Sequence, residues 1–307
     1  MRREFVDALV GAATEDDRIV LLTGDLGFNA LEPFAERFPE RFFNVGVAEQ
    51  NMLGISVGLA EAGFIPYVYS IATFATMRPY EFIRNGPVLH ELPIRIVGMG
   101  GGLDYGHNGV THYAVEDIAL MRAQPDLTII APADGGQTRA ALAAAGDLRR
   151  PIYVRLERDD TAVPGLGGRF GLGRVVQLGV GLDVLLVAVG SVAHEAVAAT
   201  ELLARDGIEA TVAIVSSFNP SPVDDLADLL ARIPAVLTIE AHYLDGGLGS
   251  FVAEVIAEHR LDCRLVRCGV RRMPRRGGGG RAHLLGDHGL SAQQLAATAT
   301  RALSFVA

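Results

Sequence analysis

A strand gives way to a helix within Asn44-Val-Gly-Val-Ala-Glu-Gln-Asn-Met52, and Glu49 stands at the junction. Apolar residues precede this glutamate, and a helical pattern with Gly54 and Gly58 follows it. A carboxyl group at such a junction lies near the free N–H groups of a helix N-terminus and in little water. One interpretation is an ordinary first-turn residue favoured by the helix dipole. The other is a buried acid that shares a proton with a ring nitrogen.

Extended and helical stretches alternate along the whole chain. In the first half the pattern predicts helices at 3–13, 48–62, 74–90 and 134–145, with strands at 18–22, 42–45, 64–70, 94–98, 127–130 and 152–155. In the second half it predicts strands at 183–189, 209–215 and 235–240, with helices at 192–206, 223–232, 247–259 and 291–304. Ser191 is placed to cap the helix at 192–206. Such alternation is typical of an α/β protein with mostly parallel sheets and helices on both faces.

Glycine interrupts this alternation in the middle of the chain. Seven glycines fall between residues 165 and 181, and this density predicts an interdomain connection. We therefore expect two doubly wound domains, at 1–160 and 182–307, joined by 161–181. Nearer the C-terminus, the loop 271–281 contains five arginines. It fits a solvated, mobile loop, and the alternative is an anion-binding or subunit-docking segment.

Composition narrows the class of protein. Of 307 residues, 50% are hydrophobic and 21% are charged, and the formal net charge is −9. This negative charge argues against general binding of nucleic acid or of anionic membranes. No unbroken apolar run reaches the roughly 18 residues of a membrane span, and the N-terminal residues lack the apolar core of a secretion signal. Two cysteines, Cys263 and Cys268, are too few for a disulfide framework or a metal site, so we expect a cytoplasmic protein.

Four loops with polar or aromatic residues follow the first four predicted strands. They contain Gly24–Gly27, Glu49, Thr73-Phe74 and the glycine-rich stretch 98–112. Open α/β sheets bind ligands beyond the carboxyl ends of their strands, so a parallel sheet would bring these loops together. The sequence therefore predicts one site built from four loops.

The stretch around Glu49 resembles the pyrimidine-binding motif of transketolases and related thiamin diphosphate enzymes, and the likeness extends over nearly the whole chain. In that family the glutamate meets N1′ of the aminopyrimidine ring. The resemblance implies a transketolase pyrimidine-binding domain followed by a transketolase C-terminal domain. The clearest mark of the latter is the run Glu-Ala-His-Tyr-Leu-Asp-Gly-Gly-Leu-Gly-Ser at residues 240–250.

Further site residues follow from the same resemblance. Thr73-Phe74 matches a segment whose aromatic side chain stacks on the pyrimidine, and Met77 replaces the family's second aromatic residue while still able to pack on a ring. The loop 98–112 resembles a transketolase loop that ends Gly-Pro-Thr-His. By this resemblance His112 would face the substrate, where it could donate a hydrogen bond to the reacting oxygen of the substrate or transfer a proton to it. The implied catalytic residues are Glu49 and His112. The implied cofactor-binding residues are Asp25, Glu49, Phe74, Met77 and Tyr80.

The substrate end departs from common sugar-phosphate transketolases. Asn108 stands where they have an aspartate that reads a substrate hydroxyl. Gly100 lies near the position at which those enzymes have a phosphate-binding histidine. Asn29 replaces a serine that they have at the same phosphate end. Arg155 matches a phosphate-contacting arginine, which could bind an anion bidentately. The implied substrate-binding residues are Asn29, Gly100, Asn108, His112 and Arg155. The groups that would contact the phosphate, which we call the phosphate clamp, are fewer here than in common transketolases.

Full-length transketolases also carry a domain that binds the diphosphate, marked by Gly-Asp-Gly and a later Asn-Asn that together hold Mg²⁺. Neither motif occurs in this sequence. The resemblance therefore implies the second subunit of a split transketolase, with no metal ligand of its own. Such a subunit would need an N-terminal diphosphate-binding partner, in an α2β2 heterotetramer, to hold thiamin diphosphate and Mg²⁺ and to act on small carbonyl substrates.

Two alternatives remain. Deoxyxylulose-phosphate synthases and the β subunits of 2-oxo acid dehydrogenases share the glutamate motif. The synthases typically have His where this chain has Asn51, and the dehydrogenase subunits lack the Gly-x-Thr-His loop. The second alternative, of another class, is a non-catalytic partner subunit, against which the intact Glu49, Phe74 and His112 argue. We expect a two-component transketolase that transfers a two-carbon ketol unit from a ketose to an aldehyde acceptor.

Overall fold

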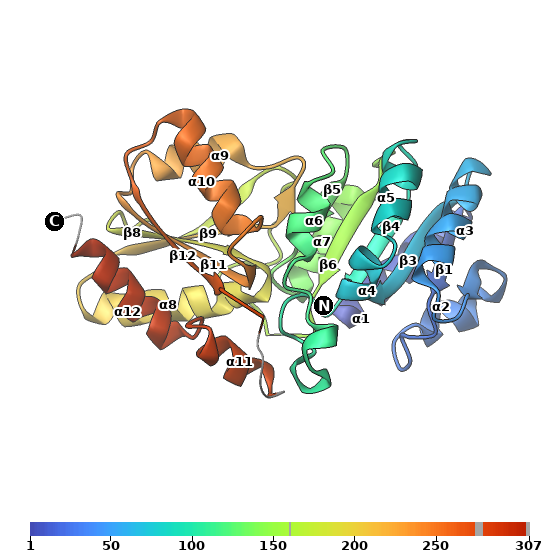
Figure 1. Ribbon diagram of the computed structural model, residues 1–307, viewed down its shortest axis with the longest axis horizontal. Helices are drawn as coiled ribbons and strands as arrows, with labels where there is room; N and C mark the ends of the chain where they lie inside the picture. Colours follow the sequence, from blue (N-terminus) through green and yellow to red (C-terminus); the bar gives the residue numbers. More distant parts are fainter. Residues whose placement is uncertain (160, 274–278, 305–307) are drawn as a thin grey trace.

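The structure is a computed structural model that describes residues 1–159, 161–273 and 279–304. Two β-sheets lie side by side along the long axis of the molecule, each between layers of helices (Figure 1). One sheet has seven strands and the other has five, and most neighbouring strands pair in parallel. The predicted α/β architecture with two mostly parallel sheets is therefore confirmed.

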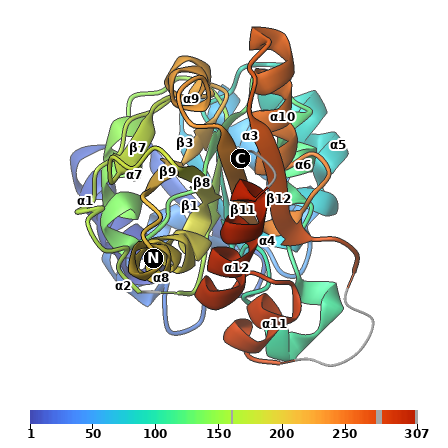
Figure 2. The same cartoon turned by 90° about the vertical axis from the view of Figure 1, so that its left-hand side faces the viewer.

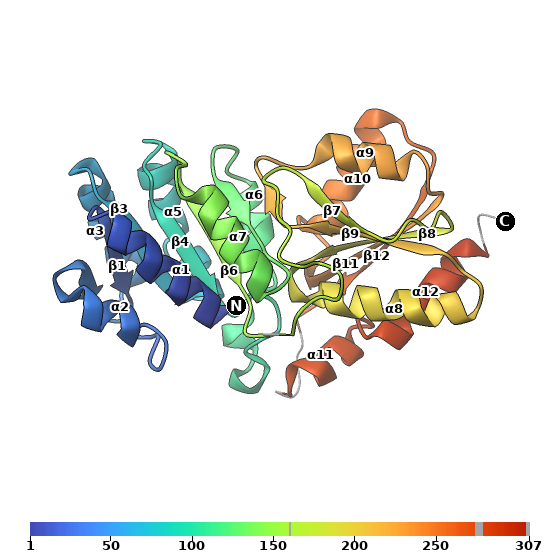
Figure 3. The same ribbon diagram turned by 180° about the vertical axis from the view of Figure 1, so that it is seen from behind.

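The seven-stranded sheet has the order β10-β5-β6-β4-β3-β1-β2. Its strands are β1 (Ile19–Thr23), β2 (Phe42–Asn44), β3 (Ile65–Ile71), β4 (Arg95–Met99), β5 (Thr128–Ile130), β6 (Ile152–Leu156) and β10 (Ser217–Phe218). One face is covered by α3 (Glu49–Glu61), α4 (Ala72–Met77), α5 (Tyr80–Ile83) and α6 (Asp117–Arg122) (Figure 1). The opposite face is covered by α1 (Arg2–Glu15) and α7 (Gly135–Ala145), as Figure 3 shows. The short helix α2 (Glu32–Arg37) follows β1.

The five-stranded sheet has the order β12-β11-β8-β9-β7. Its strands are β7 (Val175–Leu178), β8 (Val184–Val189), β9 (Ala210–Val215), β11 (Ala235–Tyr243) and β12 (Arg264–Val270). Helices α9 (Val223–Leu230) and α10 (Leu248–His259) cover one face, while α8 (Ala193–Arg205), α11 (Arg281–Asp287) and α12 (Ala292–Leu303) cover the other (Figure 2). The strand β7 pairs antiparallel with β9, so part of the expected connection belongs to this sheet.

The two domains share apolar packing and one sheet edge. The strand β10 lies in the second half of the chain but pairs antiparallel with β5 of the first sheet. Phe218 of β10 then packs edge-on against Phe251 of α10, with ring centroids 5.7 Å apart. A continuous core therefore runs from the α3 face of one sheet to the α10 face of the other. No described helix has the length and apolar character needed to cross a bilayer.

The helix predicted at 74–90 is broken into shorter pieces. It forms α4, then α5, then a π-helical turn over Arg84–Val88. Pro79 precedes α5 and Pro87 lies inside the π-helical turn. Because proline lacks an N–H and clashes with the preceding turn, a regular α-helix does not continue through either position.

Three other expectations fail for tertiary reasons. The strand β12 and the helix α11 were not predicted, because one is a half-exposed edge strand and the other has only seven residues. Ser191 does not cap α8, which begins after Val192, and its hydroxyl donates to Glu157 instead. In the arginine-rich stretch 271–281, residues 274–278 lie outside the described part, but Arg281 begins α11 and forms ion pairs, unlike a solvated loop residue.

Candidate active site

The loops after β1, β2, β3 and β4 meet at one edge of the first sheet. These four strands are direct neighbours and run parallel, so their carboxyl ends share that edge. Glu49 of α3 pairs with Arg78, which directly follows α4. Phe74 of α4 in turn contacts His112 from the loop after β4, with ring centroids 5.2 Å apart. Contacts thus link the second, third and fourth predicted segments.

Glu49 is the buried acid of this site. Its side chain is only 2% exposed, and its Oε2 accepts a hydrogen bond of 2.9 Å from Arg78 Nη1. The other oxygen, Oε1, is buried and has no hydrogen-bond partner among the described residues. Leaving a buried polar atom unpaired costs about 1–3 kcal/mol, so the position favours a ligand that brings a donor. Gly24 lies alongside, and a Cβ there would approach Gly46 O to 3.3 Å.

Phe74 forms the aromatic wall beside the glutamate. The Arg78 guanidinium carbon lies 4.2 Å from the centre of the Phe74 ring, and the His112 ring meets it edge-on. Met77 is 48% exposed, and its sulfur accepts a hydrogen bond of 3.3 Å from Thr73 Oγ1. This combination of an open apolar surface and a buried carboxyl oxygen fits a flat heterocycle with ring nitrogens.

Tyr80 is turned away from this wall. Its hydroxyl donates to Leu120 O at 3.0 Å and accepts from Gln124 Nε2 at 2.7 Å. Both partners lie in or just after α6, so the ring packs against the core of the first domain. The structure therefore does not bring the predicted cofactor residue Tyr80 to Phe74, because the break at Pro79 redirects the chain.

Asp25 lies at the exposed rim of the site and is held there by Asn44. Asn44 Nδ2 donates to Asp25 Oδ1 at 3.0 Å, and Asp25 N–H donates to Asn44 Oδ1 at 3.0 Å. Asn44 Oδ1 also accepts from Gly46 N–H at 3.1 Å. Asn44 therefore ties the loop after β1 to the turn before Glu49. It is the first residue of the motif quoted above, yet the sequence pattern assigned it no role.

His112 is half-buried and oriented by its neighbour. Thr111 Oγ1 and His112 Nδ1 lie 3.0 Å apart, whereas Nε2 forms no hydrogen bond within the described residues. The ring of Tyr105 lies 6.1 Å from that of His112, and the guanidinium of Arg158 lies 5.1 Å from the centre of the Tyr105 ring. Phe74, His112, Tyr105 and Arg158 thus follow one another outward from the glutamate.

Gly100 makes room for this arrangement. It has φ +78°, and a Cβ at this position would overlap the Tyr105 ring. A larger side chain such as histidine therefore cannot occupy position 100 while Tyr105 keeps its place. Asn108 is exposed in the turn Gly106–Asn108, and Asn29 is exposed before α2, where its N–H donates to Glu32 at 2.8 Å. Neither amide side chain forms a hydrogen bond within the described residues.

Arg155 lies between the two domains, away from the exposed site. Its Nε donates to Asp117 at 2.9 Å, its Nη1 to Glu157 at 2.5 Å, and its Nη2 to the carbonyl of Ala241 in the second domain at 3.2 Å. Burial alone would lower the pKa of Arg155, but the carboxylates of Asp117 and Glu157 raise it above its ordinary value. With all three nitrogens engaged and the side chain 1% exposed, Arg155 offers no donor to a phosphate in this arrangement.

A second arginine enters the same region from the C-terminal domain. Arg281 Nε lies 2.9 Å from Asp104, Nη1 lies 2.9 Å from Asp159, and Nη2 donates to Ser191 at 2.6 Å. Burial, together with the nearby Glu157 carboxylate, raises the pKa of Asp104 to about 7, and Arg281 opposes that shift. We call Asp104, Asp117, Arg155, Glu157 and Arg281 the interdomain ion cluster. It anchors the loop that carries His112.

Sequence reasoning missed Arg78, Tyr105 and Arg158. Arg78 stands four residues after Phe74, which places both side chains on one face of a helix. Arg158 stands two residues beyond the end of β6, whereas Arg155 lies within that strand. Position relative to the strand end was therefore the signal that could have separated the exposed arginine from the buried one.

Comparison with known proteins agrees with this site. Residues 1–163 match the family model of the transketolase pyrimidine binding domain, and residues 173–295 match that of the transketolase C-terminal domain. A putative transketolase C-terminal section from Methanocaldococcus jannaschii is 36% identical over 301 residues, which is 96% of this chain and 94% of the relative. An apulose-4-phosphate transketolase subunit from Phocaeicola vulgatus is 34% identical over 270 residues, 86% of each chain.

A solved structure extends the comparison to three dimensions. A split gene transketolase, described as an inactive β4 tetramer, superposes with a TM-score of 0.90 at 37% identity, covering 99% of this chain and 98% of that one. This chain therefore belongs to the transketolase family, whose members use thiamin diphosphate. Within that family it is the second subunit of a split transketolase, and thus a transketolase-like transferase.

Proposed function

We propose that this chain supplies the pyrimidine half of a thiamin diphosphate site and, with a partner subunit, transfers a two-carbon ketol unit from a ketose to an aldehyde. The observation that carries this proposal is Glu49 Oε1, a buried oxygen without a hydrogen-bond partner among the described residues, in a site that also holds the half-buried ring of Phe74. When bound, thiamin diphosphate supplies the nucleophilic carbon that carries the two-carbon unit.

Glu49 and its neighbours hold the pyrimidine. Arg78 occupies Oε2, so Oε1 is the oxygen left to share a proton with the ring nitrogen N1′. Phe74 and Met77 offer the ring an apolar surface, and Asn44 fixes the carboxylate of Asp25 at the rim. Tyr80 fixes α5 to α6 through its hydrogen bonds to Leu120 and Gln124 and does not contact the ring of the cofactor in this arrangement.

His112 acts on the substrate oxygen. Thr111 engages Nδ1, and this leaves Nε2 to donate to, or accept a proton from, the reacting carbonyl oxygen. The exposed amide of Asn108 lies in the same loop and reads a substrate hydroxyl through a neutral hydrogen bond. Asn29 remains a proposed substrate contact at the surface before α2, and Gly100 contributes by leaving room for Tyr105.

Arg158 supplies the anion contact that the sequence pattern indicated for Arg155. Its side chain is exposed and rests on Tyr105, next in line after His112. A guanidinium that lies on an aromatic face keeps its N–H donors free to bind a phosphate or another oxyanion. One arginine makes a weaker clamp than several polar groups, so we infer an acceptor that is less hydroxylated or unphosphorylated.

A partner subunit completes the site. Large apolar side chains in the turn before α3 and in α3, α4 and α5 are left exposed, namely Val47 at 70%, Ile55 at 38%, Met77 at 48% and Phe82 at 40%. A concavity of about 400 Å³ lies between α3 and α5 beside Phe82. Exposed apolar surface of this kind favours a protein interface. The partner carries the diphosphate and Mg²⁺ site, in an α2β2 assembly, and two free thiols fit a cytoplasmic location.

Reconstitution tests the proposal. This chain would be purified alone and together with a chain that carries Gly-Asp-Gly and Asn-Asn motifs, and each sample would be titrated calorimetrically with thiamin diphosphate and Mg²⁺. We expect tight binding and ketol transfer only from the pair. Tight binding or turnover by this chain alone would refute the half-site hypothesis.

A further inference from the structure

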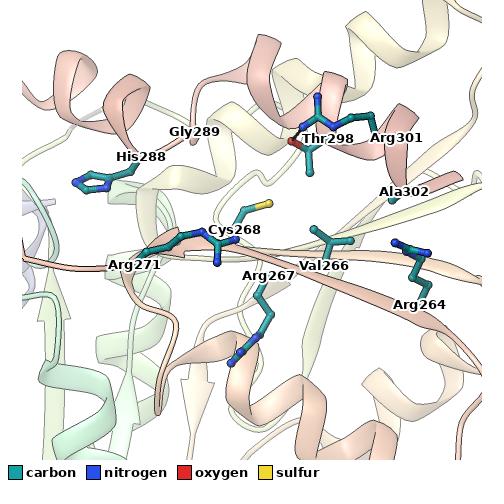
Figure 4. A pocket seen from close by; sticks show the side chains of 11 residues that line it. Arg264, Val266, Arg267, Cys268, Arg271, His288, Gly289, Thr298, Arg301 and Ala302 are labelled. Carbon is teal, nitrogen blue, oxygen red and sulfur yellow. Dashed lines mark hydrogen bonds between the residues drawn. The ribbon is translucent and has the colours of Figure 1, made fainter. Parts of the chain in front are cut away.

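A basic pocket lies in the second domain, between the edge strand β12 and the helix α12 (Figure 4). It has a volume of about 400 Å³, within the range of small-molecule sites. Glu49 and Phe74 lie in helices that cover the other sheet, so this pocket is separate from the candidate active site. No residue of the pocket takes part in the proposed chemistry.

Arginines supply the charge of this pocket. Arg271 directly follows β12 and Arg301 lies in the last turn of α12, and both are exposed. Burial raises the pKa of the Cys268 thiol to about 11, and the charges of Arg271 and Arg301, on either side of it in the pocket, oppose that shift (Figure 4). Within the described part of the chain, neither arginine forms an ion pair, and no aspartate or glutamate lines the pocket. This contrasts with a chain whose net charge is −9.

The unpaired arginines also differ from the other arginines discussed above. Arg155 forms ion pairs with two carboxylates and Arg281 with three. Arg267 borders the pocket, but its guanidinium points to the opposite side of the strand and donates to Leu244 O at 3.2 Å (Figure 4). Positive charge without a counter-charge from the described residues is therefore a property of Arg271 and Arg301 in this concavity.

Neighbouring groups give the pocket a defined shape. Arg301 Nη2 donates to Thr298 Oγ1 at 2.9 Å, which fixes the guanidinium on the wall of the helix. His288 lies at one end, where burial lowers its pKa, so at pH 7 it is neutral and offers hydrogen bonds without adding charge. Val266 and Cys268 form an apolar floor. Two guanidinium groups above an apolar floor can each bind one charged group, so the pocket is suited to an anion with at least two charged groups.

We propose that this pocket binds a compact multivalent oxyanion, a small molecule carrying phosphate or carboxylate groups. Its volume excludes a polymer as the main occupant, and the missing counter-charge is what the ligand supplies. Occupancy would link β12 to α12 and stabilise the folded domain by mass action. The bound anion would contact Arg271 and Arg301 directly.

Calorimetric titration of the full chain tests the proposal, with inorganic pyrophosphate and citrate as probes and sodium chloride at matched ionic strength as the reference. We expect at least one probe to bind with a Kd below about 1 mM. The double variant R271Q/R301Q should weaken binding by at least about tenfold, since charge-assisted bonds are lost. R205Q, which changes an exposed arginine in the last turn of α8, is the matched control and should leave Kd unchanged.

The outcomes separate the two ligand classes. Binding of pyrophosphate alone assigns a phosphorylated ligand, binding of citrate alone a polycarboxylate, and binding of both supports the shared chemistry. A second readout uses C263S, in which Cys268 is the remaining thiol, and the probe should slow its alkylation. Binding that survives R271Q/R301Q, or no effect beyond that of chloride, would overturn the proposal. Because ketol transfer is not measured, failure of the proposed function would leave this test intact.

Discussion

Glu49 with Arg78 and Asp117 with Arg155 are both carboxylate–arginine pairs at 2.9 Å, yet they differ in access to solvent. The Arg78 side chain is 47% exposed, whereas that of Arg155 is 1% exposed. An unpaired oxygen does not separate them, because Asp117 Oδ1 lacks a hydrogen-bond partner among the described residues just as Glu49 Oε1 does. The difference is that the arginine of the first pair lies at the surface, whereas both members of the second pair are buried.

This comparison teaches how to tell a site from a structural cluster. In the interdomain ion cluster, Asp117 Oδ2 also accepts from Tyr153 at 2.7 Å, and Arg155 reaches a carbonyl of the other domain. These bonds join fixed elements to one another. Around Glu49, in contrast, Phe74, Met77 and Arg78 present surface that no described part of the chain covers. We therefore expect changes in the first group to affect folding and changes in the second to affect turnover.

The largest effect should come from Glu49→Gln, which keeps the volume and removes the acid. We expect kcat of the reconstituted enzyme to fall by about 10²–10⁴, the usual contribution of an acid–base group. The urea midpoint of the chain should hardly change, because Gln can still accept a bond from Arg78. A variant that keeps more than a tenth of the wild-type rate would remove Glu49 from the chemistry.

The second-largest effect is expected on stability, and two matched variants test whether the buried and the half-exposed arginine differ. Arg155→Met should lower the free energy of unfolding by about 3–5 kcal/mol, since it strands the carboxylates of Asp117 and Glu157 in the interior. Arg78→Met should cost less than Arg155→Met, because it strands one buried carboxylate, that of Glu49, rather than two, and Arg78 itself is half-exposed. Urea denaturation measures both, and equal losses of stability would break the distinction drawn here.

His112→Ala should act on the substrate step. We expect kcat to fall at least about tenfold, in line with the loss of one charge-assisted hydrogen bond of about 1.5–3 kcal/mol. Affinity for thiamin diphosphate, measured by titration of the assembled pair, should stay the same because His112 contacts the outer side of Phe74. If cofactor affinity falls and kcat at saturation does not, His112 belongs to the cofactor site.

The smallest effect concerns Arg158. Arg158→Ala should raise KM for phosphorylated sugars by about tenfold or less and leave unphosphorylated analogues unaffected, because one exposed guanidinium is lost. A panel of kcat/KM values for xylulose 5-phosphate, ribose 5-phosphate and their unphosphorylated and deoxy forms would measure this. A preference of several orders of magnitude for phosphates in the wild type would show that the clamp is stronger than we infer.

The sequence predicted the elements whose pattern is local. The alternating strands and helices of both domains, and the junction at Glu49, were recognised because hydrophobic period and turn residues specify them along the chain. The break after α4 also has a local cause, because Pro79 and Pro87 interrupt a regular helix, but the predicted helix at 74–90 was continued through both prolines. Predictions for Asp25, Phe74 and Met77 as cofactor residues still await a direct test.

The arginine assignment shows where sequence reasoning stopped. Arg155 and Arg158 are three residues apart and carry the same charge, so the pattern alone did not separate them. What separates them is the second domain, which covers Arg155 with Ala241 and leaves Arg158 at the surface. The local sequence holds only part of this information, namely the position of each arginine relative to the end of β6, and it does not reveal the contact with Ala241.

The short strand β10 limits how this protein can be recombined. Ser217 and Phe218 come from the second half of the chain but complete the edge of the first sheet beside β5. A chimaera spliced at the connection between the halves would join a foreign edge strand to Thr128–Ile130, and any mismatch in register would turn Phe218 away from Phe251. Exchange among relatives is therefore expected to succeed for the whole chain more readily than for either half.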